Sequence, residues 1–319
     1  MHAISCSTGH RNLSRSRGSL LLPIATALLP VLALFSPSTA AAGATLDRIK
    51  QAGVLKLGYG PDGPYTSKEG SGNPGGFALD LCRTVADGVK ADLGLPALKV
   101  EYVPLPRDAS LRAVVEGKVD VLCDVTVPTT ATRKLVSYSI PVFASGVGAV
   151  VRRSASDRLK DILLGRTPPT APSWRGNADR LLRDSTISVV AGTRAETVVA
   201  DRLGDLQLIP RIVPVSDYAA GLARVVDGRS NIFFGDRAIL LDAIRRGNFP
   251  GELQLLDRYF TLEMVAFALP RGDEDLRLSV DTALSKLFRS DEFPAVFVKW
   301  FGPLGPNTLN YFRVSTLTE

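Results

Sequence analysis

Short apolar runs and amphipathic stretches alternate along most of this chain. β-Branched runs favour buried strands, whereas apolar residues four apart, as at Leu81, Val85 and Val89, favour a helix. The pattern predicts strands at 53–58, 100–103, 119–123, 147–152, 187–190, 208–213 and 230–234, and an extended segment at 259–269. It predicts helices at 45–50, 76–93, 108–116, 156–164, 217–227, 273–289 and 294–300, and one that runs from the turn at 191–196 to 203, with Thr45 and Asp108 as N-caps.

The stretch 120–146 changes in composition along its length, and we interpret the rest of the chain as arranged around it. It begins at the end of an apolar run, continues as a Thr-rich patch and ends as the extended segment SYSIPVF. Thr126, Thr129, Thr130 and Thr132 supply four hydroxyls, and Arg133 supplies a planar guanidinium. These groups suit a polar or anionic small molecule. The alternative is a turn followed by a helix N-cap, because threonine is common at both.

The elements between 53 and 123 follow the order strand, helix, strand, helix, strand. This order implies a parallel sheet, and such sheets bind ligands at the carboxyl ends of their strands. The Thr-rich patch lies at one of these ends, so we expect it to border a ligand site.

Residues 1–42 have the three parts of a secretory signal peptide. The first part carries Arg11, Arg15 and Arg17 and no acid, 20–35 is apolar apart from Thr26, and small residues follow up to Ala42. The apolar run is shorter than the roughly 20 residues that span a membrane. We therefore expect cleavage after Ala42 and export to the periplasm, without a lipid anchor.

Removing this segment changes the charge and the available chemistry. Both histidines and three of the 38 basic residues leave with it, but none of the 32 acids, so the mature chain carries 35 against 32, or +3. A chain without histidine has no Ser-His-Asp or Cys-His nucleophile and no His-ligated metal. We expect no metal and no cofactor, and no nucleic-acid partner, because no basic stripe with interleaved aromatics is present.

Cys82 and Cys123 are the two cysteines that remain. In an exported protein they are expected to pair, which would close a loop of about 40 residues and stabilise the fold by roughly 3 to 4 kcal/mol. Two buried free thiols are the alternative.

Several motifs, in order, resemble one known family. They are GVLKLGY from 53, GFALDLCRTVAD from 76, GKVDVLC from 117 with its Thr-rich turn and SYSIPVFASG, AGTRAE from 191, DRAILL from 236 and WFGP from 300. Together they resemble the family 3 extracellular solute-binding proteins, the amino-acid receptors of ABC importers. The resemblance implies an α/β, two-lobed type II periplasmic-binding-protein fold, with two βαβ lobes joined by two hinge strands. It places lobe 1 at 45–144 plus 264–319 and lobe 2 at 145–263.

The resemblance also implies a function. A member of this family binds an amino acid or a related carboxylate-bearing molecule in the cleft between its lobes, closes about a hinge and delivers the ligand to an inner-membrane ABC permease. We expect a monomer that performs no chemistry. One alternative is an enzyme on the same fold, similar to cyclohexadienyl dehydratase, with Asp124, Asp236 or Glu263 as acid or base. Another is a sensory or accessory binding module.

The family pattern maps onto most, but not all, of the expected ligand contacts. Asp236 matches the aspartate that takes the ligand ammonium, and Gly192 and Thr193 match a Gly-Thr turn whose backbone N–H groups meet the carboxylate. Counting back from 138, the carboxylate-binding arginine should stand at 132, where this chain has Thr132. Arg133 is one position later, about 100° around a helical turn.

Two basic residues stand where the family usually has neutral ones. We expect Arg194, and with it Arg107, to replace the missing guanidinium, the alternative being exposed arginines. The remaining candidate ligand contacts are Thr126 and Thr130 of the Thr-rich patch and Tyr59 and Tyr65 near the first strand, one of which is expected to pack in the core. The Pro-rich stretch 165–180 departs from the family pattern and predicts a surface excursion that either covers the cleft or forms a plain loop.

Overall fold

The structure is a computed structural model that describes residues 43–60, 63–66, 74–166, 180–247, 249 and 251–318. The predicted signal peptide and most of the Pro-rich excursion lie outside these residues. Within them, no helix combines the length and the apolar character needed to cross a membrane. The strands are β1 (Val54–Tyr59), β2 (Lys99–Pro104), β3 (Val121–Thr126), β4 (Val136–Tyr138), β5 (Phe143–Ser145), β6 (Val147–Arg152), β7 (Thr186–Val190), β8 (Arg211–Val215), β9 (Ile232–Asp236), β10 (Leu253–Leu255) and β11 (Glu263–Pro270).

Helices alternate with these strands through most of the described chain. The α-helices are α1 (Ala44–Ala52), α2 (Phe77–Leu93), α3 (Ser110–Val115), α4 (Asp157–Leu164), α6 (Arg194–Asp205), α7 (Tyr218–Val226), α8 (Arg237–Arg246), α9 (Glu274–Arg289), α10 (Phe293–Phe301) and α11 (Pro306–Val314), and two short 3-10 helices are η1 (Arg107–Ala109) and η2 (Thr132–Lys134).

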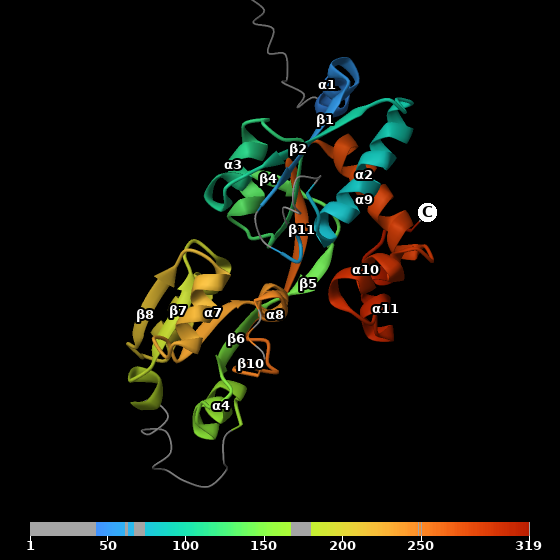
Figure 1. Ribbon diagram of the computed structural model, residues 1–319. Coiled ribbons are helices and arrows are strands. Elements are labelled where there is room, and N and C mark those ends of the chain that lie inside the picture. Colours follow the sequence, from blue (N-terminus) through green and yellow to red (C-terminus); the bar gives the residue numbers. More distant parts are fainter. Residues whose placement is uncertain are drawn as a thin grey trace, which may run out of the picture. The chain divides into compact units, whose positions relative to one another are not determined.

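The first lobe is built on a sheet with the strand order β2-β1-β3-β11-β4, to which β5 adds by pairing with β11. β1 is parallel to β2 and β3, as the order of elements predicts, whereas β11 runs antiparallel to its neighbours. Figure 1 shows this late strand, in orange-red, among blue and green strands. The chain therefore returns to its first sheet after building a second one.

The second lobe has a sheet of order β10-β6-β9-β7-β8, in which β7 is parallel to β8 and β9 and β6 is antiparallel to β9. The chain enters this sheet between Ser145 and Val147 and leaves it between β10 and β11. The two crossing points agree with a fold of two lobes joined by two strands. The exact lobe limits, at 144/145 and 263/264, stay a prediction.

Cys82 and Cys123 form a disulfide with an S–S distance of 2.07 Å, as predicted. Cys82 lies on the buried face of α2, and Cys123 lies in the middle of β3. The bond therefore fixes the strand that leads into the Thr-rich patch to the longest helix of the first lobe.

Two predicted helix caps were wrong. α1 has Gly43, in the left-handed conformation, as its N-cap, and Thr45 instead donates its backbone N–H to Asp273. The helix predicted at 108–116 begins as a 3-10 turn, and the Asp108 side chain caps neither part of it. In both places the prediction took the polar side chain nearest to the expected helix start as the N-cap. The helices begin at other residues, Gly43 for α1 and Pro106 for η1.

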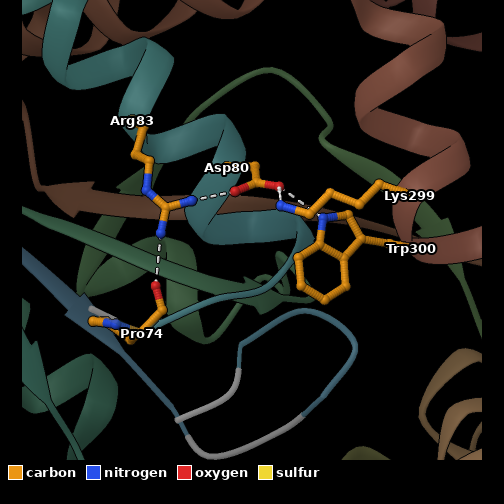
Figure 2. Close-up of polar contacts among 5 residues, drawn as sticks. All are labelled: Pro74, Asp80, Arg83, Lys299 and Trp300. Carbon is orange, nitrogen blue, oxygen red and sulfur yellow. Dashed lines mark hydrogen bonds and ion pairs between the residues drawn. The ribbon is translucent and has the colours of Figure 1, made fainter. Parts of the chain in front are cut away.

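One carboxylate attaches α10 to α2 (Figure 2). Asp80, in the first turn of α2, accepts hydrogen bonds from the Trp300 indole at 2.8 Å and the Lys299 ammonium at 2.9 Å, and it pairs with Arg83. Arg83 also donates to the carbonyl of Pro74 at 2.7 Å. The contact links a C-terminal helix to the N-terminal part of the same lobe.

We expect Asp80→Ala to lower the free energy of unfolding by about 1 to 3 kcal/mol, because the indole N–H and two cations lose their shared acceptor. Chemical denaturation measures the change. Asp87→Ala is the control, since Asp87 is on the same helix but largely exposed and, among the described residues, pairs with Lys90 alone. An equal effect of the two substitutions would contradict this account.

A second carboxylate, that of Asp281 on α9, is buried and contacts the segment between β4 and β5. It accepts the backbone N–H of Ile140 at 2.7 Å, but burial outweighs this bond and raises the pKa of Asp281 from 3.8 to about 6. Ionising this group in the folded protein is therefore unfavourable. Its contribution to stability is complete below about pH 4 and is lost as the pH rises through about 6.

We expect Asp281→Asn to remove a pH dependence worth up to about 3 kcal/mol between pH 4 and pH 7, because asparagine keeps the acceptor for Ile140 but does not ionise. The variant should gain stability relative to the wild type as the pH rises through this range. Urea unfolding at several pH values checks this, and parallel pH curves for the two proteins would refute it.

Candidate functional site

A cavity of about 450 Å³ is lined by residues of both lobes. Its wall comes from the segment after β2, the end of β3, the strands β5 and β11, and the N-terminal turns of α6, α7 and α8. Of the predicted ligand contacts, it includes Arg107, Thr126, Thr132, Gly192, Thr193, Arg194 and Asp236. Among the described residues, no group of three or more histidine, cysteine, aspartate or glutamate side chains is arranged to hold a metal ion.

Asp236 ends β9 and is the N-cap of α8, so one residue serves both the strand end and the helix start. Its Oδ1 atom accepts the backbone N–H groups of Ala238 at 2.9 Å and Ile239 at 3.1 Å. The carboxylate therefore faces the positive end of the α8 dipole.

Two hydroxyl groups complete the surroundings of Asp236. Ser145, at the end of β5, donates to Oδ2, and the Tyr65 hydroxyl lies 3.4 Å from Oδ1 and 3.2 Å from the Ser145 hydroxyl. Burial raises the pKa of Asp236, although the hydrogen bonds from Ser145, the α8 backbone and Tyr65 oppose this.

Hydroxyl and amide groups are the donors that hold Asp236 in the part of the chain that the structure describes. These donors are neutral, so none of them cancels the negative charge. A desolvated carboxylate of this kind favours a cation brought by a ligand.

The two candidate tyrosines differ in position. Tyr65 is fully buried, its ring packs against Phe143 and Phe301, and burial beside Asp236 raises the pKa of its hydroxyl well above 10. Tyr59 belongs to the same apolar core as Tyr65, and neither tyrosine is part of the cavity wall. Both candidate tyrosines therefore pack in the core, and Tyr65 also contacts Asp236 through its hydroxyl.

The Thr-rich patch is used partly for its own backbone. The hydroxyls of Thr129 and Thr132 lie 3.0 Å apart, and each accepts the backbone N–H of the other residue. This reciprocal turn matches the alternative that the sequence left open for these two residues. Thr126 lines the cavity beside them, whereas Thr130 is exposed and lies outside its wall.

Arg133 lies away from this cavity. Its guanidinium carbon is 6.0 Å from the centre of the Tyr138 ring, and it borders a different hollow together with Arg271 and Glu274. Thr132 lines the cavity and Arg133, one position later, does not, as expected for residues about 100° apart around a helical turn.

The Gly-Thr turn carries internal partners where a ligand carboxylate was expected. The backbone N–H of Gly192, at a φ of +71°, donates to the Glu196 carboxylate at 2.8 Å, and the Thr193 hydroxyl donates to the Val190 carbonyl at 2.7 Å. Arg194 donates through Nε to Glu263 on β11 at 2.8 Å. The guanidinium thus lines the cavity with one edge already engaged.

Several wall residues were absent from the predicted ligand contacts. Ser145 touches Asp236, Tyr218 accepts the Asp236 backbone N–H at 3.1 Å, Glu196 caps the Gly-Thr turn and Glu263 pairs with Arg194. The spacing of Glu196, four residues after Gly192 at a helix start, was a signal for its role. Nothing local to Ser145 or Tyr218 indicates their contacts, which depend on how the strands and helices assemble.

Comparison with known proteins agrees with this geometry. The family model of the bacterial extracellular solute-binding proteins, family 3, matches residues 55–303. The L-glutamate/L-aspartate-binding protein of Pseudomonas aeruginosa is 26% identical over 269 residues, which cover 83% of each chain. The glutamate/aspartate import solute-binding protein of Escherichia coli is 22% identical over 289 residues, 90% of this chain and 89% of that protein.

The fold also matches solved structures. An ancestral amino acid-binding protein, described as a precursor of cyclohexadienyl dehydratase, superposes with a TM-score of 0.65 at 23% identity and covers 81% of this chain and 99% of its own. At this identity the match concerns the fold alone, and it confirms the predicted fold class. With the family model spanning most of the sequence, the chain belongs to the bacterial extracellular solute-binding proteins, family 3, and is a solute-binding receptor.

Proposed function

We propose that this receptor binds an amino acid between its lobes, with the α-ammonium on Asp236, and passes it to an ABC permease. The observation that carries the proposal is the Asp236 carboxylate, which lines the cavity and is held by neutral donors. A partly buried carboxylate in a cavity pairs strongly with a ligand's ammonium group, because the bound ligand leaves little water to compete for either charge.

The α-carboxylate of the ligand would be received by guanidinium groups of the same wall. Arg194 uses its Nε in the contact with Glu263, and an arginine has four further N–H donors on its terminal nitrogens. Arg107 lines the cavity from the first lobe, in η1. A guanidinium matches the two oxygens of a carboxylate, and this supports the replacement of the missing arginine at 132.

The wider setting is part of the same proposal. The named relatives bind glutamate and aspartate, and one is named for import, which supports delivery to an inner-membrane permease. Those relatives are binding proteins, so we propose ligand capture by lobe closure without chemistry. We also propose that the mature chain is a periplasmic monomer.

We expect at least one common amino acid to stabilise the mature chain, since a ligand at 100 times its Kd adds about 2.7 kcal/mol. Asp236→Asn should weaken that ligand's binding by about 100-fold or more, because its ammonium loses a buried charge partner. Thermal-shift screening and isothermal titration measure the two effects.

The matched control is Asp227→Asn, which changes an exposed aspartate of the second lobe that pairs with Arg229. The ligand affinity of Asp227→Asn should equal that of the wild type. If no amino acid stabilises the chain, or if Asp236→Asn binds as tightly as the control, the proposal fails.

Tyr65 acts as a positioning residue for the ammonium site in this proposal. Its hydroxyl hydrogen bond is one of the contacts that lower the pKa of Asp236 against the effect of burial. Removing it should make the carboxylate easier to protonate.

We therefore expect Tyr65→Phe to raise the pH at which ligand affinity begins to fall on acidification, and to weaken binding about threefold to tenfold at neutral pH. Titrations from pH 5 to pH 8 provide the profile. Tyr102→Phe, the same change on β2, is the control. A weaker but pH-parallel binding curve would assign Tyr65 a packing role alone.

A further inference from the structure

The hollow that Arg133 borders is a second concave site on the first lobe. It has a volume of about 340 Å³ and lies between the segment of η2 and β4 and the turn that joins β11 to α9. Its wall shares no residue with that of the cavity around Asp236. The polar and charged side chains of this wall are those of Arg133, Ser137, Tyr138, Arg271, Glu274 and Arg277.

The wall of this hollow carries an excess of positive charge. Three guanidinium groups face the single carboxylate of Glu274, which leaves two positive charges. Glu274 pairs with Arg277, whereas Arg133 and Arg271 form no ion pair within the described part of the chain. A further acid, the buried Asp281, acts on Arg277 from within the lobe, and counting it still leaves the wall positive.

Two of the guanidinium groups are already fixed by hydrogen bonds. Arg271 donates through one terminal nitrogen to the carbonyls of Arg133, at 3.2 Å, and Lys134. Arg277 donates to Glu274 through Nε, at 2.9 Å, and one terminal nitrogen. An arginine has five N–H donors, so both side chains retain N–H groups that these bonds do not use. Side chains ordered in this way lose less conformational entropy when they bind a ligand.

Neutral groups add to the donors of the hollow. The Ser137 hydroxyl accepts the backbone N–H of Gly272 at 3.1 Å, so its own proton can be donated to a ligand. α9 begins beside the hollow, with Glu274 as its first residue, and the positive end of its dipole favours an anion there. The hollow therefore combines charged and neutral donors and a positive potential.

The number of donors and the net charge indicate the class of anion. A guanidinium fork matches two oxygens of a carboxylate or a phosphate. A carboxylate has only two oxygens and one charge, which a single fork can satisfy. A phosphate group presents three or more oxygens and up to about two negative charges, which suits several guanidinium groups and a wall with two positive charges.

We propose that this hollow is a second ligand site, which binds a phosphate group with two negative charges, as inorganic phosphate or as a phosphomonoester. The proposal is independent of the amino-acid site, because it uses neither Asp236 nor Arg194. The two sites lie on either side of η2, where Thr132 lines the cavity and Arg133 lines the hollow.

Isothermal titration of the mature chain with inorganic phosphate, glycerol 3-phosphate and acetate tests the proposal. At least one of the two phosphates should bind about tenfold or more tightly than acetate, because acetate can occupy only one fork. The ionic strength is held constant with chloride, so that general screening is the same for each anion. Tighter binding of glycerol 3-phosphate would assign the site to a monoester, and tighter or equal binding of inorganic phosphate to the free ion.

Variants then locate the anion. Arg133→Gln combined with Arg277→Gln should weaken phosphate binding about tenfold or more, because the charges of Arg271 and Glu274 then cancel. Arg133→Gln alone changes an exposed side chain and should cause part of this loss.

The matched control is Arg158→Gln combined with Arg202→Gln, which removes two exposed arginines of the second lobe. Arg202 pairs with an acid three residues away, as Arg277 does. This control should bind phosphate as the wild type does.

Three results would overturn the proposal. One is that neither phosphate binds more tightly than acetate. Another is that the variant without Arg133 and Arg277 binds phosphate as tightly as the control. The third is that Arg194→Gln abolishes phosphate binding while that variant retains it, which would place the anion in the amino-acid cavity instead.

Discussion

The structure depends on one partly buried carboxylate at the junction of its two lobes. Asp236 ends β9, caps α8 and accepts a hydrogen bond from the hydroxyl of Ser145 on β5, the strand by which the chain first leaves the first lobe. A second contact repeats the arrangement, since Glu263 on the returning hinge strand holds Arg194 at the start of α6. Ser145 and Glu263 are direct partners in the pairing of β5 with β11. The connection between the lobes therefore carries the groups that fix the two helix starts lining the cavity.

This arrangement explains why the cavity can respond to its ligand. A group that binds Asp236 acts on a residue already bonded to a hinge strand, and a group that binds Arg194 acts on a residue bonded to the other. Closing the lobes requires only that the ligand favours one arrangement of these contacts over another. Binding of this kind needs no reactive side chain. The two histidines of the sequence, His2 and His10, lie in the predicted signal peptide, outside the cavity.

Most of the fold could be predicted from the sequence, because apolar periodicity records which faces are buried. β1, α2 and β3 followed from that pattern, and the disulfide followed from the cysteine count and the expected export. The short strands β4, β5 and β10 did not, since three residues carry too little periodicity to be recognised. Tertiary pairing with β11 and β6 is what makes these segments strands.

The candidate site was less predictable for a related reason. Asp236 and the Gly-Thr turn stand at fixed places in strand-to-helix motifs, so a local match sufficed to find them. Arg194 faces the cavity as expected, but its partner Glu263 is 69 residues away and no local signal joins them. Thr129 and Thr132 bond one another, which shows how easily hydroxyls near a site are taken by the backbone.

The disulfide has a consequence for the life of the protein. Asp124 and Thr126 follow Cys123 on β3, so the wall of the receptor is secured by a bond that forms only where thiols are oxidised. Under reducing conditions packing alone would hold this strand, so the binding surface reaches its final covalent state only in an oxidising environment.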